Sequence, residues 1–493
     1  MEKEEYKKLF IGGDLTGIQK FLYNISSQKA AVSLKGRSSY LSDFMDRKCE
    51  AVLEAVQQAG AKDVHRIYCS GGKFYITADL QNGVIDALEQ CANAIQQQLW
   101  KEHHGELNLN IGYLPFTENS GGSVDADGQK DVKPGILWEK VNAQFAHKKN
   151  MKFKHLLQSH FPDLFSPIAV GGTPHICAVT GIESDQCVKI PDEDEEIYVL
   201  PSVKYQIDQG RKLNASDHAK EFEEYARDSY LGVLRMDVDN LGTRLTKGFD
   251  SIQAYEKFSE RLCDFFEKRL KDIRKEDEFA SFINIIYAGG DDIFVVGRWD
   301  KTIDFAERVH RELTQKFRAD NLSISGGVVI VKPKYPISKA AEQAGEAEDA
   351  AKNFEYKGEK KNAFHLLGKT VSWTQEFDEV KALKEQFVKL INDHGLSKGL
   401  LHKLMLYASI AEQNKICERD GKTPDYSYIW HLPYYLTRYI KRYEGYPDVK
   451  SFCLELRDQR IDFKNTRSLE LIALAARWAE LTLKKTDKEV NNP

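Results

Sequence analysis

The sequence predicts an α+β protein that contains an internal repeat and ends in a helical bundle. Runs of apolar and β-branched residues flank a Gly-Gly pair twice, beginning at Gly71 and at Gly289, as expected for tight hairpins. Each hairpin follows an apolar strand that ends in an aspartate, with 57 residues from Asp14 to Gly71 and 52 from Asp237 to Gly289. From residue 378 onward the apolar spacing is that of helices. A repeated unit followed by helices accounts for all three observations.

The first copy of the repeat is expected over residues 1–115. Its expected elements are, in order, a strand, a helix, a hairpin and a strand, over residues 9–14, 15–23, 64–76 and 106–114. The hairpin tip, Ser70, Gly71 and Gly72, is followed by Lys73 rather than by acidic residues. Because a lysine cannot bind a cation, this copy is predicted to support the second one.

The second copy, expected over residues 226–377, carries the acidic residues. Its expected elements are a strand, a helix, a hairpin and a strand, over residues 231–238, 251–274, 283–297 and 322–330. Asp291 and Asp292 follow the Gly-Gly pair, and Asp237 ends the first strand. Adjacent buried carboxylates repel each other unless a cation neutralises them, so we predict a site for two Mg²⁺ or Mn²⁺ ions that serves phosphoryl transfer. A solvated acidic turn is the alternative.

The segment between the copies, residues 116–225, reads as an inserted linker domain. It begins with a loop-like stretch rich in Gly and Asp and contains an acidic run near residue 194. His175, Cys177 and Cys187 are metal-ligating residue types, but the two cysteines are ten residues apart and neither has a partner two or three residues away. A zinc site is therefore unlikely, and we expect these residues to be structural.

Two lysines after the second copy are candidates for contact with a triphosphate. Lys352 ends an Ala/Glu-rich helical pattern and Lys361 lies in a basic stretch. Solvated helix lysines are the simpler alternative. Residues 378–493 are expected to form a helical domain whose basic residues face either solvent, RNA or a partner protein.

Composition bounds the class of protein. The formal net charge is −5 over 493 residues, so contact with nucleic acid would need local basic patches. No apolar run reaches the length of a membrane span and the charged N-terminus lacks a signal-peptide core, so we expect a cytoplasmic protein without membrane contact. Eight scattered cysteines without a CxxC pair fit reduced thiols.

Four motifs taken together resemble one family. They are Gly-Asp-Leu-Thr-Gly-Ile-Gln-Lys-Phe from residue 13, Leu-Lys-Gly-Arg-Ser-Ser-Tyr-Leu from residue 34, Arg-Met-Asp-Val-Asp-Asn-Leu-Gly from residue 235 and Gly-Gly-Asp-Asp from residue 289. In this order they resemble the large subunit of type III CRISPR RNA-guided effector complexes, closest to the III-A kind. The resemblance implies two ferredoxin-like palm domains of the cyclase and polymerase type, a linker domain and a C-terminal helical domain.

The resemblance also implies an activity. Members of the family respond to target RNA in antiviral defence by joining ATP through 3′–5′ linkages into cyclic oligoadenylate second messengers. Here Asp237, Asp291 and Asp292 would be the catalytic and metal-binding residues. The implied nucleotide-binding residues are Gly289, Gly290, Val238 and Asn240 on the second palm and Ser70, Gly71 and Gly72 on the first, with Arg37 and Ser38 as further contributors of unassigned role.

The partners implied are the small subunit, the subunit that binds the guide end, the guide RNA and the target RNA. Many members begin with a histidine-aspartate nuclease domain. Since the first predicted strand starts near Leu9 and no His-Asp dipeptide occurs, we expect that nuclease activity to be absent.

Three rival interpretations stay open at this point. The same palms could couple ATP to S-adenosylmethionine, or the chain could be a non-catalytic scaffold for RNA and subunits. A free-standing diguanylate cyclase is less consistent, because those enzymes pair two copies of one palm whereas this chain supplies both halves.

Overall fold

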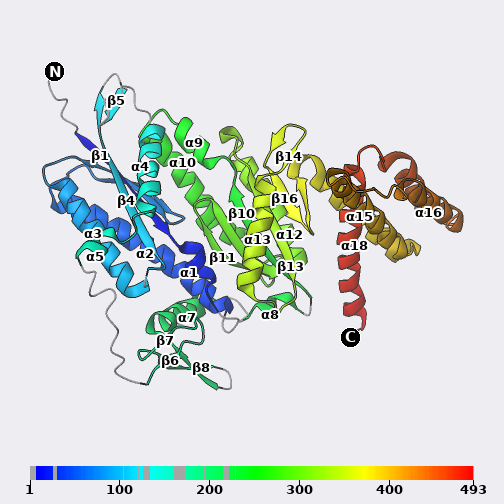
Figure 1. Ribbon diagram of the computed structural model, residues 1–493, viewed down its shortest axis with the longest axis horizontal. Helices are drawn as coiled ribbons and strands as arrows, with labels where there is room; N and C mark the ends of the chain where they lie inside the picture. The colour runs from blue at the N-terminus through cyan, green and yellow to red at the C-terminus, as the bar shows by residue number, and fades with distance from the viewer. Residues whose placement is uncertain are drawn as a thin grey trace. The chain divides into compact units, whose positions relative to one another are not determined.

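The computed structural model describes residues 7–25, 30–103, 105–119, 122–125, 134–159, 173–192, 195–214, 221–227 and 229–491 (Figure 1). The chain divides into two compact units, one of Met1–Ile324 with Ile330–Glu346 and the other of Ser325–Val329 with Ala347–Pro493. The mixed α and β class predicted from the sequence is confirmed. The division into four domains at residues 115, 225 and 377 stays a prediction.

The first copy of the repeat forms an antiparallel sheet with the strand order β2-β3-β1-β4-β5. The elements are β1 (Lys8–Thr16), α1 (Ile18–Tyr23), α2 (Ala30–Gln58), β2 (His65–Ser70), β3 (Lys73–Asp79), α3 (Val84–His103), β4 (Asn108–Asn119), β5 (Gly122–Asp125), α4 (Pro134–Lys149) and α5 (Lys154–Ser159). The predicted hairpin consists of β2 and β3. Most of the chain between β1 and this hairpin forms the long helix α2.

The second copy repeats this arrangement, because β11-β12-β10 has the same order as β2-β3-β1. Its elements in the first unit are β10 (Leu231–Val238), α9 (Leu241–Lys247), α10 (Ile252–Asp264), the π-helical turn η1 (Phe265–Arg269), α11 (Leu270–Lys275), β11 (Ile283–Gly289), β12 (Asp292–Arg298), α12 (Trp299–Lys316) and the 3₁₀ turn η2 (Arg318–Asp320). The helix predicted over residues 251–274 is thus interrupted by a π turn, which apolar periodicity does not reveal.

The core of the second copy explains why these strands form. Leu234 on β10, Val295 on β12 and Ile303 on α12 are at most 1% exposed. The apolar face of α12 packs on β10 and β12, which removes this surface from water and fixes the strands from which the acidic residues project.

The segment between the copies forms a small subdomain of the first unit. It contains β6 (His175–Ile176), β7 (Glu183–Ser184), β8 (Val188–Asp192), β9 (Glu195–Val199), α7 (Pro201–Asn214) and α8 (Phe222–Ala226). Cys177, Ile190, Val203 and Ile207 form its apolar core together with Val32 of α2. Helix α7 packs along α2, so the subdomain rests on the first copy.

The second unit is largely helical. It contains β14 (Glu355–Tyr356), β15 (Glu359–Lys360), β16 (Ala363–Leu366), β17 (Lys369–Ser372), η3 (Trp373–Phe377), α14 (Asp378–His394), α15 (Gly399–Arg419), α16 (Tyr428–Arg442), α17 (Pro447–Glu455), η4 (Leu456–Arg460) and α18 (Arg467–Asn491). Two further elements, β13 (Ile324–Val331) and α13 (Ile337–Lys352), contribute residues to both units. Among the described helices, none has the length and apolarity needed to span a membrane.

Candidate functional site

Strand pairing brings two of the predicted carboxylates together. Asp237 on β10 lies directly opposite Asp292 on β12 in the antiparallel register. Residues directly opposite each other project from the same face of a sheet, with Cβ atoms about 5 Å apart. The backbone N–H of Val238 donates to the carbonyl of Asp291 at 3.0 Å, which joins the end of β10 to the acidic turn. The predicted proximity of Asp237 to the acidic pair is thus present in the backbone.

A buried arginine supplies positive charge to this face of the sheet. Arg235 precedes Asp237 by two residues on β10 and is 8% exposed, and its Nη2 atom lies 3.7 Å from Oδ2 of Asp292. A Cβ atom added to Gly345 of α13 would lie 2.8 Å from Nη1 of Arg235, so the guanidinium lies against that helix. The sequence reasoning missed Arg235, although the period-two alternation of a strand places it on the same face as Asp237.

The oxygen donors fit a magnesium-type ion, but they do not form the three-carboxylate clamp expected from the sequence. Within the described part of the chain, no group of three or more His, Cys, Asp or Glu side chains gathers closely enough to hold a metal ion. The negatively charged carboxylates repel one another. The carboxylate of Asp292 faces the guanidinium of Arg235, which offsets part of its charge. Mg²⁺ typically binds proteins through one or two carboxylates and takes its remaining ligands from phosphates and water. The opposed pair Asp237 and Asp292 fits that mode.

The same position in the first hairpin is occupied by cations of the protein itself. Asp14 at the end of β1 lies opposite Lys73 on β3, just as Asp237 lies opposite Asp292. Asp14 is 5% exposed, and Lys149 of α4 pairs with it at 2.7 Å. The first copy thus neutralises its strand-end aspartate with Lys149, and it carries Lys73 where the second copy carries Asp292. Lys149 is remote in sequence and was not foreseen.

The tips of the two hairpins touch each other. A Cβ atom added to Gly71 would lie 2.8 Å from Cα of Gly290, and one added to Gly290 would lie 3.0 Å from Cα of Gly71. Both residues have positive φ angles, +59° and +70°, which glycine adopts without strain. The N–H of Gly290 donates to Oγ of Ser70 at 3.1 Å. The two copies therefore meet at their hairpin tips, and this contact brings Ser70, Gly71, Gly289 and Gly290 together.

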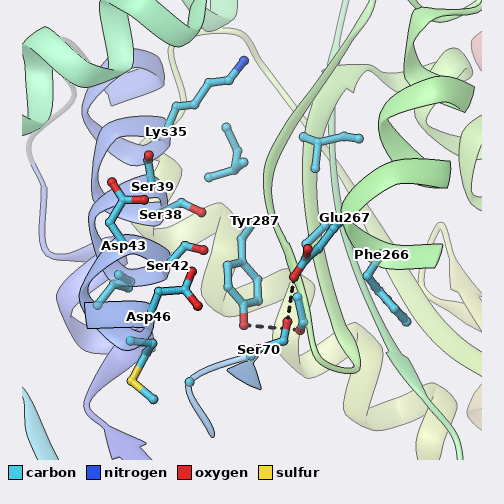
Figure 2. Close-up of a pocket in the computed structure, with 18 of the residues that line it drawn as sticks. Lys35, Ser38, Ser39, Ser42, Asp43, Asp46, Ser70, Phe266, Glu267 and Tyr287 are labelled. Carbon is cyan, nitrogen blue, oxygen red and sulfur yellow. Dashed lines mark hydrogen bonds between the residues drawn. The ribbon is translucent and has the colours of Figure 1, made fainter. Parts of the chain in front are cut away.

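A cavity of about 580 Å³ lies beside this contact. Figure 2 shows its polar residues on α2 facing Tyr287 and Glu267, with Ser70 between the two walls. The α2 wall presents Lys35, Ser38, Ser39, Ser42, Asp43 and Asp46, and the tip residues Gly71 and Gly72 complete the lining. Its volume is that of a typical small-molecule site. The pocket is therefore lined mainly by α2, the first hairpin, η1 and β11, and the three aspartates are not among its lining residues.

Tyr287 lies between the pocket and the acidic turn. Burial raises the pKa of its phenol well above the usual range, and the charges of Asp292 and Asp291 raise it further. Burial also raises the pKa of Tyr68, and the charge of Asp291 is among the smaller causes that raise it further. The Tyr287 hydroxyl stays protonated and donates to the carbonyl of Gly289 at 3.3 Å. The negative charge of the acidic turn therefore contributes to the raised pKa of both tyrosines.

Other predicted residues have structural surroundings. Val238 is buried, and Asn240 takes a left-handed conformation with φ of 59° at the start of α9. Arg37 is 3% exposed and donates to the carbonyls of Phe21 and Asn24 and to Gln206. Burial lowers its pKa to about 10. Arg37 therefore ties α2 to α1 and α7, and a contribution to the site stays a prediction.

The two candidate lysines belong to the second unit. Lys352 pairs with Glu348 one helical turn away at 2.7 Å, and Lys361 follows β15 with φ of 65°. Their contact with a triphosphate stays a prediction. In the linker segment, Cys177 is buried in the apolar core and Sγ of Cys187 lies 3.3 Å from the carbonyl of His175.

Comparisons with known proteins point to one group. Residues 7–167 match the family model described as Csm1 subunit domain B, and residues 230–365 match the one described as Cas10/Cmr2, second palm domain. A protein from Enterococcus italicus is 27% identical over 80% of this chain and 59% of its own length, and one from Streptococcus thermophilus is 23% identical over 88% and 62%. Both are named CRISPR system single-strand-specific deoxyribonuclease Cas10/Csm1 (subtype III-A).

Solved structures share the fold. The apo Csm1–Csm4 cassette matches with a TM-score of 0.65 at 19% identity over 97% of this chain and 70% of that one. The same cassette in complex with cA4 matches with a TM-score of 0.61 at 20% identity over 96% and 71%. The chain spans between 52% and 62% of the length of the five curated Cas10/Csm1 relatives.

Proposed function

We propose that this chain, which belongs to the Cas10/Csm1 family of type III-A CRISPR systems, joins ATP molecules into cyclic oligoadenylates within an RNA-guided effector complex. The observation that carries the proposal is the register of Asp237 and Asp292 beside the contact between the two hairpin tips. It supplies carboxylates for an ion at one hairpin and a nucleotide-sized pocket at the other.

The strand orders support two ferredoxin-like palm domains. Strands β2-β3-β1-β4 follow the order of a ferredoxin-like βαββαβ unit, and β11-β12-β10 repeat its first three positions. We assign the palms to residues 1–115 and 226–377, the linker domain to residues 116–225 and the helical domain to residues 378–493.

In the reaction that we propose, the residues of the chain bind and orient two nucleotides. Asp237 and Asp292, with Asp291 beside them, would hold Mg²⁺ or Mn²⁺, and these ions would neutralise the triphosphate and activate the attacking hydroxyl. The pocket, whose lining includes Ser38, Gly71 and Gly72, would hold the other nucleotide.

The proposed reaction is a nucleotidyl transfer. The 3′-oxygen of one ATP forms a bond to the α-phosphorus of the next, and the bond from that phosphorus to the bridging oxygen of the β-phosphate breaks. Pyrophosphate leaves, and the hydroxyl proton passes to solvent. Because the two hairpin tips touch, the two nucleotides would lie close enough for in-line attack.

The partners are proposed from the family. The cassettes of similar fold pair Csm1 with Csm4, and one neighbour is described as part of the type III-A CRISPR-Csm interference complex. We propose that this chain assembles with equivalent subunits, with guide RNA and with target RNA.

Product analysis of the assembled complex tests the proposal. The complex is incubated with ATP and Mg²⁺ or Mn²⁺, with and without target RNA, and the products are identified by mass. We expect cyclic oligoadenylates only when target RNA is present. Products that contain S-adenosylmethionine when it is added would replace this function by the coupling reaction, and no product at all would favour a scaffold.

A pair of double variants assigns the site. Asp291→Ala with Asp292→Ala should abolish the product and leave assembly intact. Asp277→Ala with Glu278→Ala removes two exposed acidic residues of the same unit and should leave synthesis unchanged. Equal activity of the two double variants would refute the assignment.

A further inference from the structure

The backbone of the acidic turn is held from two sides. From its own sheet, the N–H of Val238 donates to the carbonyl of Asp291 at 3.0 Å. From the other copy, Oγ of Ser70 accepts the N–H of Gly290 at 3.1 Å. A Gly-Gly turn restricts its own backbone little, so external contacts of this kind decide where the following carboxylates lie.

The hydroxyl of Ser70 has a further partner. It lies 3.5 Å from Oε1 of Glu267, which is long for a hydrogen bond. Glu267 belongs to the π turn η1, and the extra residue of a π turn re-aims the side chains of a helix. Ser70 thus links β2, the acidic turn and the helix that runs through η1.

The close approach of the two tips leaves little freedom at this point. Tyr68 also reaches the turn, since a Cβ atom on Gly290 would lie 3.1 Å from its hydroxyl. Ser70 is the last residue of β2, whose pairing with β3 is fixed through Lys73. The backbone that carries its Oγ atom is therefore held in place by the sheet.

We infer that Ser70 is a positioning residue whose hydroxyl anchors the acidic turn of the second palm by accepting the Gly290 N–H. This replaces the contact with nucleotide predicted from the sequence as its principal role. The inference rests on the proposed function, because only then does the position of the turn matter for catalysis. The degenerate hairpin thereby sets the geometry of the acidic one.

Hydrogen exchange of the full chain, read by mass spectrometry on peptides covering residues 286–292, tests the anchor without any need for activity. In Ser70→Ala, the turn amides should exchange roughly fivefold faster, the factor that corresponds to the ~1 kcal/mol of a typical hydrogen bond. Peptides from the rest of β12 should be unchanged. Turn amides that exchange at the wild-type rate would overturn the inference.

The pair Ser70→Thr and Ser70→Val isolates the hydroxyl, because the two side chains have nearly the same shape. Thr should keep the slow exchange and Val should lose it, and equal rates in both would overturn the inference. In the assembled complex, Val should lower kcat for product formation about fivefold and leave KM for ATP nearly unchanged. If wild type makes no product while Ser70→Ala still speeds exchange of the turn, the proposed function fails and the anchor stands.

Discussion

Adding a single methyl group at Gly71 should separate the two palms. The Cβ atom of Gly71→Ala would lie 2.8 Å from Cα of Gly290, whereas ordinary van der Waals contact begins at 3.4 Å. The tips must therefore move apart by at least the difference of about 0.6 Å, because both partners are backbone and neither can rotate away. A misplacement of about 1 Å between reacting groups can cost about 100-fold in rate.

We expect Gly71→Ala to lower the rate of product formation roughly 10- to 100-fold. The positive φ of +59° adds a backbone cost of about 1–2 kcal/mol that concerns stability rather than geometry. Gly395→Ala is the matched control, because its φ of +67° is similar and no atom lies within 4 Å of the added Cβ.

The assay is the initial rate of product formation from ATP by the assembled complex, with thermal unfolding of each variant measured in parallel. Both variants should unfold at somewhat lower temperature, and only Gly71→Ala should lose activity. Equal rates for the two variants would refute the argument that contact between the tips sets the catalytic geometry.

Two further predictions concern ion pairs. Arg467→Met removes the guanidinium that binds both carboxylate oxygens of Glu376, which is 2% exposed, at 2.8 and 2.6 Å. This substitution should lower the free energy of unfolding, measured by chemical denaturation, by about 3–5 kcal/mol. Arg477→Met removes one partner of an exposed ion pair and should change that free energy little. Hydrogen bonding from Arg269 lowers the pKa of Glu312 below its usual value, so this carboxylate stabilises the fold near neutral pH and the contribution is lost as pH falls through the lowered pKa. Glu312→Gln should therefore be less stable than wild type at pH 7, and the difference should shrink as the pH falls from the usual glutamate pKa of 4.5 through the lowered pKa of Glu312; a difference independent of pH would contradict it.

The positions of the two hairpins could be predicted from sequence because their signals are local. Alternating apolar residues on either side of Gly-Gly define β2 with β3 and β11 with β12. The similar spacing of Asp14 and Asp237 from their hairpins, 57 and 52 residues, predicted an internal repeat, and the two copies share the strand order β2-β3-β1 and β11-β12-β10. Because β10 pairs with β12, the aspartate at the end of β10, Asp237, lies beside the tip of the second hairpin.

The charges that balance the aspartates could not be predicted in the same way. Lys149 reaches Asp14 across 135 residues of sequence, and nothing in the local pattern of α4 points to it. Arg235 is close in sequence to Asp237, but its burial depends on the space that Gly345 leaves on α13. Such contacts depend on tertiary packing, which periodicity does not encode.

The contact of Ser70 with the acidic turn could not be predicted for a related reason, because it joins two hairpins that are 220 residues apart in sequence. Only the contact between the tips reveals that Gly290 already donates to it. Similarly, the π turn that carries Glu267 lies within a continuous helical stretch and was not predicted from apolar periodicity.

The most direct test of the account is Mn²⁺ binding, measured by electron paramagnetic resonance on the purified chain with Asp237→Asn and with Asp14→Asn. Both substitutions remove one strand-end carboxylate at equivalent positions of the repeat. The account predicts that Asp237→Asn weakens Mn²⁺ binding at least tenfold, because the charge of the ligands sets the affinity for the ion, and that Asp14→Asn leaves it unchanged. Equal binding by wild type and Asp237→Asn would contradict the central claim that the second hairpin is the metal site.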